Sequence, residues 1–241
     1  MTKKQGTLYG IGVGPGDPEL LTVKAVKILA HVDVVFTASS TRNTFSLAVD
    51  IARPHLPETV DVRHLSFPMT QDKDALKSAW RENSLSILSV LDQGKDAAFL
   101  TLGDPMTYST FGYILQDIRE VRQDIPIVTV PGITSYQAAA ARMNVPLVEA
   151  EESLLLTSGA YGGGNVRKFS DCAENVVLLK AYRNVKDITR ALAESDMIEN
   201  SRAIRKCGRE GEEIIEDIRV LADREPDYWT LILAKQGRKK D

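Results

Sequence analysis

Three short loops carry the residues best suited to bind a small polar ligand. They are Gly12–Thr22 (GVGPGDPELLT), Thr101–Thr110 (TLGDPMTYST) and Pro131–Ser135 (PGITS). In each loop glycine lets a ligand approach the backbone closely, while Asp, Ser or Thr supplies oxygen atoms. A helix that begins directly after such a loop presents free N–H groups, which bind carboxylate or phosphate. The residue types therefore favour ligand binding and positioning.

Residues for covalent or metal-based catalysis are not arranged in any familiar pattern. The three histidines, His31, His55 and His64, have no spacing typical of a metal site. The two cysteines, Cys172 and Cys207, are far apart in the sequence and form no C-x-x-C motif. We therefore expect no metal centre, no disulfide and no protein nucleophile, and the cysteine content suits a reducing cytoplasm.

Strands and helices must position the three loops. Each loop follows an apolar run that predicts a buried strand, at Thr7–Val13, Ala97–Leu102 and Ile125–Val130. Each loop also precedes a helical pattern, at Leu20–Ala30, Phe111–Arg122 and Tyr136–Met143. This alternation predicts a parallel sheet with helices on both faces, and therefore an α/β fold. Ligands of such sheets bind beyond the carboxyl ends of the strands, where all three loops would emerge.

Further elements complete the first half of the chain. Strands are expected at Val32–Thr37 and Val60–Leu65, and helices at Phe45–Ala52 and Asp72–Asp92. Gly94 fits a left-handed residue that ends the longer helix. Candidate helix caps in this half are Asp17 or Thr22 for the first helix and Ser109 or Thr110 for the helix that begins at Phe111.

Strands and helices alternate less regularly in the second half of the chain. Strands are predicted at Ser153–Ser158, Val176–Ala181, Ser201–Cys207 and Tyr228–Ala234, with a short one at Ile214–Ile215. A helix is predicted at Val185–Glu194, with Asn184 as its cap, and Gly159–Gly164 is the most flexible-looking stretch. We expect two domains, an N-terminal α/β domain over 1–134 and a C-terminal α+β domain over 135–241.

Composition narrows the class of protein. The chain has 241 residues, of which 43% are hydrophobic and 26% charged, and its net charge is −3. This is ordinary for a globular protein, and the slight acidity gives no reason to expect nucleic acid binding. We see no signal peptide and no apolar run long enough for a membrane span, so we expect a cytoplasmic protein without membrane partners.

The order and spacing of the three loops resemble those of the tetrapyrrole methylase family, and the resemblance covers Leu8 to Ala234. Within that family, the run Gly103–Phe111 (GDPMTYSTF) is most similar to the branch that methylates carbon 20 of precorrin-2 or cobalt-factor II. Phe67–Thr70, Ala79–Trp80 and Pro146–Glu149 support the same branch. Two stretches depart from the pattern. Thr37–Asn43 lacks the Pro-Lys pair that often follows this strand, and Gly159–Gly164 is unusual.

The resemblance implies two αβα domains, a homodimer, and S-adenosylmethionine bound in a cleft between the domains. It implies that Asp104 pairs with the ammonium group of the cofactor, which leaves the enzyme as S-adenosylhomocysteine. The positions that match cofactor-contacting residues are Pro15, Gly103, Asp104, Thr107, Thr134, Ser135, Ala181 and Gly208.

The substrate implied by the resemblance is a tetrapyrrole with eight carboxylates. A site for it needs basic side chains, and arginine can bind a carboxylate through two hydrogen bonds. The candidates at predicted loop or strand ends are Arg42, Lys180, Arg183 and Arg209. The candidates for the base that removes the final proton are Tyr108 and a water molecule.

Several alternatives stay open at this point. The chain could be a methylase for another precorrin carbon or uroporphyrinogen III, or belong to the diphthine synthase branch, which acts on a protein. It could also be a nucleotide-binding module that uses Gly10–Gly16 for phosphate, or a dimeric scaffold without turnover. The sequence does not decide whether the tetrapyrrole carries cobalt.

Overall fold

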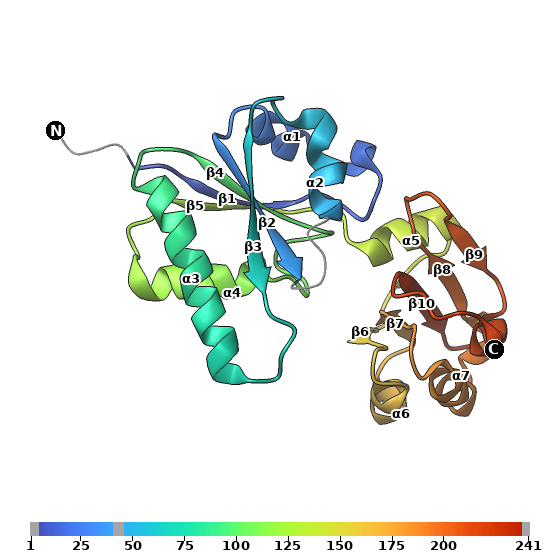
Figure 1. Ribbon diagram of the computed structural model, residues 1–241. Coiled ribbons are helices and arrows are strands. Elements are labelled where there is room, and N and C mark those ends of the chain that lie inside the picture. Colours follow the sequence, from blue (N-terminus) through green and yellow to red (C-terminus); the bar gives the residue numbers. More distant parts are fainter. Residues whose placement is uncertain (1–4, 41–45, 238–241) are drawn as a thin grey trace. The chain divides into compact units, whose positions relative to one another are not determined.

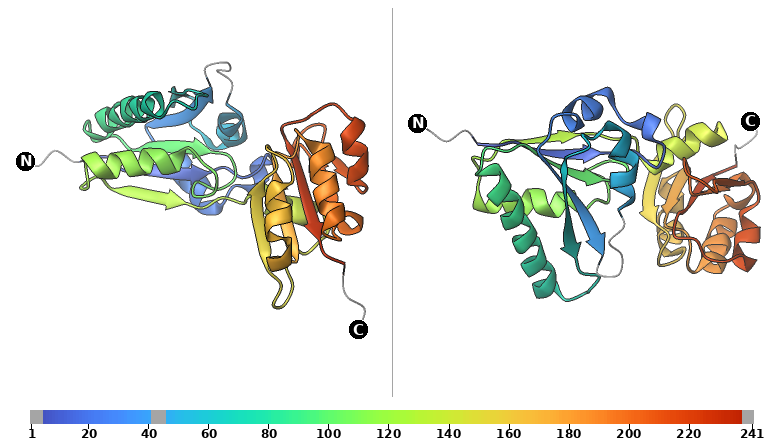
Figure 2. Two further views of the ribbon diagram at one scale, coloured as in Figure 1. Left: turned by 90° about the horizontal axis from the view of Figure 1, so that it is seen from below. Right: turned by 45° about the horizontal axis from the view of Figure 1, so that its top comes forward.

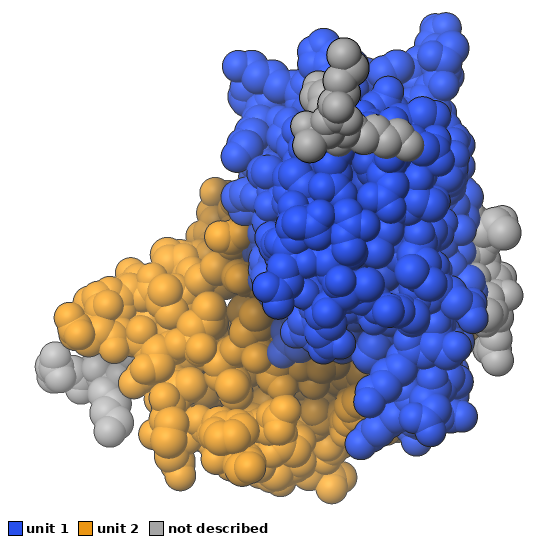
Figure 3. Space-filling view, turned by 90° about the vertical axis from the view of Figure 1, so that its left-hand side faces the viewer, with its two compact units in different colours: residues 1–134 blue, residues 135–241 orange. Residues whose placement is uncertain are grey.

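The computed structural model describes residues 5–40 and 46–237. Contacts divide the chain into two compact units, unit 1 at Met1–Thr134 and unit 2 at Ser135–Asp241 (Figure 3). Each unit is built on its own sheet, in the order β3-β2-β4-β1-β5 for the first and β6-β7-β10-β8-β9 for the second. The two units are described separately below.

All strand pairs of the first sheet are parallel, as the alternating pattern predicts (Figure 2). The strands are β1 (Leu8–Gly12), β2 (Val34–Ser40), β3 (Asp61–Phe67), β4 (Ala97–Thr101) and β5 (Ile127–Val130). The helices are α1 (Val23–Leu29), α2 (Leu47–Ala52), α3 (Lys73–Leu91) and α4 (Phe111–Val121), with short 3-10 turns at Pro18–Leu20 and Arg53–His55.

The first sheet has a hydrophobic core on each face because successive strand residues point to opposite sides. On β4, Phe99 joins the cluster beneath α3 and α4, whereas Ala98 and Leu100 join the cluster beneath α1 and α2. Figure 1 shows these helix pairs on opposite sides of the sheet. The sheet is therefore covered on both faces, and its strand ends and their loops remain for ligands.

Local signals at helix ends account for several boundaries in unit 1. The Thr22 side chain accepts a hydrogen bond from Ala25 N at 3.2 Å, so α1 begins at Val23 and not at Leu20 as predicted. Asp17 caps the separate 3-10 turn instead. Asp72 caps α3 by accepting from two backbone N–H groups, and Gly94 has the expected left-handed backbone (φ 80°).

The second sheet is mixed. Strands β6 (Leu154–Ser158) and β7 (Asn175–Leu179) pair in parallel, whereas β10 (Thr230–Lys235) runs antiparallel to both β7 and β8 (Arg202–Arg205). Strand β9 (Glu213–Ile215) returns antiparallel beside β8. The carboxyl ends of β6, β7 and β8 therefore lie at the same edge of the sheet as the amino end of β10.

Helices cover both faces of the second sheet. Helices α6 (Gly164–Phe169) and α7 (Val185–Glu194) contact each other, and α5 (Ser135–Met143) contacts β10. Figure 1 shows α5 on one side of the sheet and α6 and α7 on the other. Short 3-10 turns lie at Ser170–Cys172, Ile198–Asn200 and Ile218–Asp223.

Two sequence predictions in unit 2 need correction. Asn184 precedes α7 as predicted, but it has a left-handed backbone (φ 53°) and its side chain makes no capping hydrogen bond. The glycine-rich stretch leads into α6, a helix that we did not predict. Gly163 N donates to the Asp187 carboxylate at 2.8 Å, so a side chain of α7 fixes this turn from outside the local sequence.

Unit 2 holds most of the described carboxyl groups whose pKa is lowered. In unit 2 these are Glu152, Glu174, Asp187, Glu212 and Glu213, and in unit 1 there is Asp124. For Asp187 the largest cause is the hydrogen bond from Arg167, followed by that from Gly163 N–H. A carboxyl whose pKa is lower in the folded state stabilises that state at neutral pH, and this stability is lost as the pH falls through the folded pKa.

We expect unit 2 to unfold at a higher pH than unit 1 during acid titration, starting below the ordinary glutamate pKa of 4.5. Each unit contains one tryptophan, Trp80 or Trp229. Fluorescence of the variants Trp80→Phe and Trp229→Phe therefore follows the units one at a time. Coincident transitions, or an earlier change at Trp80, would contradict this expectation.

Candidate active site

The loops after β1 and β4 are bound to each other at the carboxyl edge of the first sheet. Gly103 N donates to Gly14 O at 2.8 Å, and Gly14 N donates to Gly103 O at 3.3 Å. Both glycines have positive φ angles, 81° at Gly14 and 64° at Gly103, which other residues rarely adopt. The two predicted ligand loops thus form one structure.

A third loop joins them through close backbone packing. A Cβ atom added at Gly132 would lie 2.1 Å from the carbonyl oxygen of Gly103 and 2.8 Å from Cα of Gly12. A Cβ added at Gly12 would lie 2.5 Å from that same oxygen. Only glycine permits this approach, because the neighbouring atoms are backbone and cannot rotate away. At Gly103 the nearest atom to an added Cβ is 3.8 Å away, so the packing there is ordinary van der Waals contact and less close.

Asp104 connects two of the loops. One carboxylate oxygen accepts from Met106 N at 2.9 Å and from the Thr107 hydroxyl at 3.4 Å, and the other accepts from Gly132 N at 3.1 Å. The carboxylate therefore has a structural task within unit 1. The oxygen that accepts from Gly132 N can accept a further hydrogen bond, so this task is compatible with binding a cationic ligand.

The run Tyr108–Phe111 contains residues with different tasks. Phe111 is fully buried, and its ring occupies the space above Gly10, where an added Cβ would lie 2.2 Å from it. The Ser109 hydroxyl lies 2.8 Å from that of Thr101 and accepts from Phe111 N at 3.1 Å, so Ser109 satisfies the first N–H group of α4 from outside the N-cap position. Thr110 makes no side-chain capping bond. Tyr108 is 64% exposed and has a left-handed backbone (φ 50°).

Pro15, Thr107 and Thr134, the other predicted residues of these loops in unit 1, lie at the same edge of the first sheet. Pro15 is buried beside the Gly14–Gly103 pair, and Thr107 is half-buried. Thr134 is buried, and its Cα is the atom nearest to a Cβ added at Gly103, at 3.8 Å. Ser135 is the first residue of α5. These residues can offer backbone groups and hydroxyls to a ligand.

Two predicted residues of unit 2 have their backbone N–H groups already engaged. Ala181 is fully buried, and its N–H donates to Thr230 O at 2.9 Å. The Gly208 N–H donates to the Glu212 carboxylate at 2.6 Å, and Glu212 also forms an ion pair with Arg142. Any ligand contact at these positions must use other atoms than the N–H groups.

Three of the predicted basic residues lie at one edge of the second sheet, together with aromatic rings. The cationic groups of Lys180, Arg183 and Arg209 lie over the rings of Tyr228, Tyr182 and Trp229, at 5.5, 5.0 and 4.6 Å from the ring centres. We call these six residues the aromatic–cation edge. The fourth candidate, Arg42, lies outside the described residues.

Sequence reasoning missed the aromatic part of this edge. Tyr182 and Tyr228 pack edge to face at 5.3 Å, and Tyr228 packs against Trp229 at 5.2 Å. A signal was present, because Asp227-Tyr228-Trp229 precedes the last strand and Lys180-Ala181-Tyr182 follows β7. Relating the two required the antiparallel pairing of β10 with β7, which the sequence does not give.

Backbone strain marks the ends of several strands. Among residues with positive φ, asparagine, aspartate and glycine are unremarkable. The others are Ala150, which precedes β6, and three larger residues, Tyr108, Lys180 and Lys206. Each of these three lies at or near the carboxyl end of a strand, after β4, β7 and β8 respectively. Such strain persists where the surrounding structure fixes it, and it is frequent at functional sites.

The described residues give little support to nucleophilic or metal chemistry of the protein's own. Burial, followed by the charge of Glu212, raises the pKa of the Cys207 thiol to about 11, so the reactive thiolate is disfavoured. No group of three or more His, Cys, Asp or Glu within 5–40 and 46–237 is arranged to hold a metal ion. No described helix has the length and apolar character to span a membrane.

Residues 7–219 match the family model described as Tetrapyrrole (Corrin/Porphyrin) Methylases, which covers most of the chain and the loops after β1, β4 and β5. The chain belongs to this family. The resemblance inferred from the loops is thereby confirmed.

Curated members of the family are similar over much of the chain. A cobalt-precorrin-2 C(20)-methyltransferase of Salmonella typhimurium is 31% identical over 96% of this chain and 97% of its own length. A probable cobalt-precorrin-2 C(20)-methyltransferase of Methanocaldococcus jannaschii is 37% identical over 75% of this chain and 74% of its own. A precorrin-2 C(20)-methyltransferase of a Sinorhizobium species is 30% identical over 95% of this chain and 94% of its own.

Solved structures of tetrapyrrole methylases share the fold. A cobalt precorrin-4 methyltransferase superposes with a TM-score of 0.71 at 24% identity, covering 95% of this chain and 94% of the other. A uroporphyrin-III C-methyltransferase of Thermus thermophilus, complexed with S-adenosylhomocysteine, gives a TM-score of 0.68 at 22% identity, covering 95% and 92%. The predicted α/β fold with two sheets is confirmed.

Proposed function

We propose that this chain transfers a methyl group from S-adenosylmethionine to carbon 20 of precorrin-2 or its cobalt complex, in cobalamin biosynthesis. The observation that carries the proposal is the similarity, over nearly the full length of both chains, to a curated enzyme with that activity. A second such enzyme, named without cobalt, is similar over almost the same length. The metal-free and the cobalt-containing substrates therefore both remain in the proposal.

The loops after β1, β4 and β5 fit the amino acid part of S-adenosylmethionine. The Asp104 oxygen that accepts from Gly132 N can accept a further hydrogen bond from an ammonium group. Thr134 ends the loop after β5 and Ser135 begins α5, and the N-terminus of a helix suits a carboxylate. We assign to Pro15 and Thr107, in the same loops, further contacts with S-adenosylmethionine.

In unit 2 we assign the adenosine part to Ala181 and Gly208. Because both N–H groups donate to protein acceptors, recognition there would rely on carbonyl oxygens and on shape. These assignments, like the two domains with a ligand cleft between them, rest on the family pattern.

In this reaction the protein contributes mainly by positioning the methyl donor and the tetrapyrrole. S-adenosylmethionine supplies a methyl group that its sulfonium already activates. The carbon–sulfur bond breaks as the bond to carbon 20 forms, the sulfur keeps the bonding electron pair, and carbon 20 then loses a proton. Holding the reactants in attack geometry can lower a barrier by roughly 7–11 kcal/mol. Tyr108, exposed and held in a left-handed conformation, is our candidate to contact the substrate near that proton.

We also propose a homodimer in the cytoplasm, since the family pattern implies a dimer. Both cysteines are free thiols, which suits a reducing compartment. Light scattering of the purified chain tests the dimer directly.

Incubation with S-adenosylmethionine and either metal-free precorrin-2 or its cobalt complex tests the function. We expect a product heavier by one methyl group, with the new carbon–carbon bond at carbon 20 by NMR. Methylation at another carbon would replace the proposal with a different tetrapyrrole methylase. Failure with both substrates, together with methylation of a protein acceptor, would favour the diphthine synthase branch.

A further inference from the structure

We propose that the aromatic–cation edge of unit 2 binds carboxylates of the tetrapyrrole, with Arg209 and Lys180 as the principal contacts. The inference rests on the proposed function, because it names a binding site for the substrate of that reaction. Arg183, at the exposed end of the edge, is a secondary contact.

Arg209 carries the strongest evidence. Its guanidinium lies over the Trp229 ring at 4.6 Å, and its Nη1 atom is buried without a hydrogen-bond partner among the described residues. A buried cationic donor without an acceptor is costly, so such groups are usually paired. The stacked guanidinium has its plane fixed by the ring, which prepares it to donate to a planar carboxylate.

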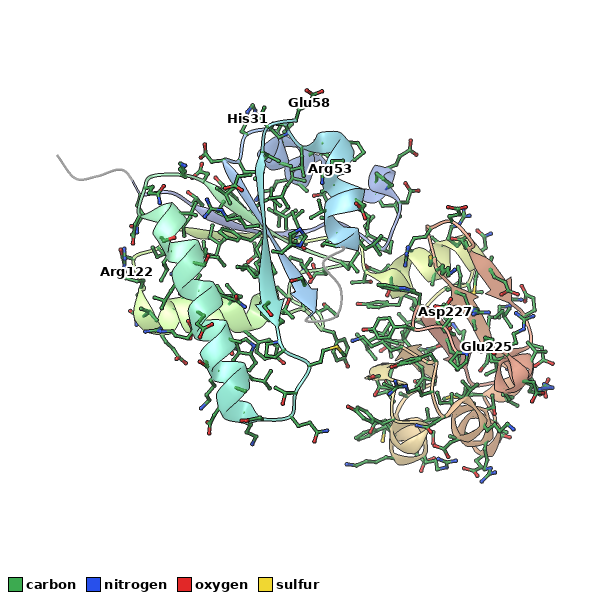
Figure 4. The ribbon with its side chains drawn as sticks, in the orientation of Figure 1. His31, Arg53, Glu58, Arg122, Glu225 and Asp227 are labelled. Atoms are coloured by element: carbon green, nitrogen blue, oxygen red, sulfur yellow. The ribbon has the colours of Figure 1, made fainter. Side chains whose placement is uncertain are left out.

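The ring beneath Arg209 is itself held in place. Trp229 N donates to the Asp227 carboxylate at 2.9 Å, and Trp229 O accepts from Lys206 N at 3.2 Å. Asp227, labelled in Figure 4, also accepts from Arg205 at 3.4 Å. The Arg209 loop is closed by Glu212, which accepts from Gly208 N. Ring and cation are therefore positioned by backbone contacts, as a preformed site requires.

Lys180 supplies a second cation beside the first. Its Nζ atom lies 5.5 Å from the centre of the Tyr228 ring, and that ring packs against Trp229. The left-handed backbone of Lys180 (φ 56°) ends β7 and turns the chain at this edge. Glycine or asparagine would adopt that conformation with less strain. The presence of lysine at this position therefore indicates that its side chain has a function.

The three cationic side chains of the aromatic–cation edge differ in their partners from most other arginines of unit 2. Six of those arginines form ion pairs with carboxylates: Arg142, Arg167, Arg202, Arg205, Arg219 and Arg224. Lys180, Arg183 and Arg209 have no ion pair within 5–40 and 46–237 and face aromatic rings instead. Several unpaired cations on one edge match a ligand with several carboxylates. The methyl donor has only one.

Fluorescence titration of the Trp80→Phe variant tests the site, because Trp229 is then the sole tryptophan. The probe is uroporphyrin, an octacarboxylic porphyrin that absorbs light and quenches a nearby indole. We expect Arg209→Gln to weaken porphyrin binding by about tenfold or more and Lys180→Gln by about fivefold. Affinity for S-adenosylhomocysteine, measured by calorimetry on the same samples, should stay unchanged.

Lys186→Gln is the matched control, since it removes one exposed positive charge from α7 of the same unit. Circular dichroism verifies that each variant is folded. If Arg209→Gln keeps full porphyrin affinity, or weakens it no more than Lys186→Gln does, the inference is wrong. Equal loss of porphyrin and S-adenosylhomocysteine binding would also overturn it, because the edge would then serve the methyl donor. Failure of the wild-type chain to bind S-adenosylhomocysteine would instead count against the proposed function.

Discussion

Replacing Gly132 with alanine is expected to abolish detectable binding of S-adenosylhomocysteine and to destabilise unit 1 by about 3 kcal/mol. The new methyl group would lie 2.1 Å from the carbonyl oxygen of Gly103, which is far inside van der Waals contact. Relief requires the β4 and β5 loops to separate. That separation would break the hydrogen bond from Gly132 N to Asp104 and disturb the proposed donor site.

Gly112→Ala provides the control for Gly132→Ala. A Cβ at Gly112 meets nothing within 4 Å, and the residue lies in the first turn of α4. Alanine should therefore stabilise the protein by about 0.5 to 1 kcal/mol, through the better helix propensity alone. Calorimetry and urea unfolding of both variants give the comparison. Normal ligand affinity in Gly132→Ala would mean that the three loops can separate without loss of the site.

Asp104→Ala is expected to lower kcat/KM for methyl transfer by about 100-fold or more, which corresponds to roughly 3 kcal/mol of lost transition-state binding. Two effects add. The proposed ammonium partner is removed, and Met106 N, Thr107 and Gly132 N lose their shared acceptor. The measurement is steady-state methyl transfer together with the dissociation constant of S-adenosylhomocysteine.

Asp104→Asn separates the two effects. Asparagine keeps an oxygen for Met106 N and Thr107 but presents an NH2 group to Gly132 N and carries no charge. If the charge matters most, Asp104→Asn should bind S-adenosylhomocysteine almost as poorly as Asp104→Ala while unfolding at a higher temperature. Normal affinity in Asp104→Ala would refute the assignment of this loop to the methyl donor.

The sequence predicted well those features that are set by neighbouring residues. The helix at Asp72–Asp92 is found at Lys73–Leu91 because its apolar period and Asp72 cap are both local. The three ligand loops meet because their strands are parallel neighbours, which follows from alternating strands and helices. The close approach of Gly132 to the carbonyl oxygen of Gly103 follows from that arrangement, but only the structure shows it.

Features set by residues distant in sequence could not be predicted. The glycine-rich turn before α6 is fixed by Asp187, more than twenty residues later. Trp229 contacts Arg209 because β8 and β10 pair antiparallel. The hydrophobic periodicity of the sequence does not indicate which strands pair. The engagement of Gly208 N–H by Glu212 was likewise invisible, although both residues lie in one short loop. Loop conformation depends on such side-chain contacts more than on residue type.

The burial of Phe111 changes how its motif should be used to compare family members. Of the run Tyr108–Phe111, the phenylalanine fills the space that Gly10 leaves, and Ser109 caps a helix. Positions 10 and 111 should therefore covary, a larger residue at one accompanying a smaller residue at the other. Such paired substitutions would reflect repacking of the protein interior. They would give no information about which carbon of the tetrapyrrole is methylated. The exposed residue at position 108 is the one whose replacement should track substrate preference among homologues.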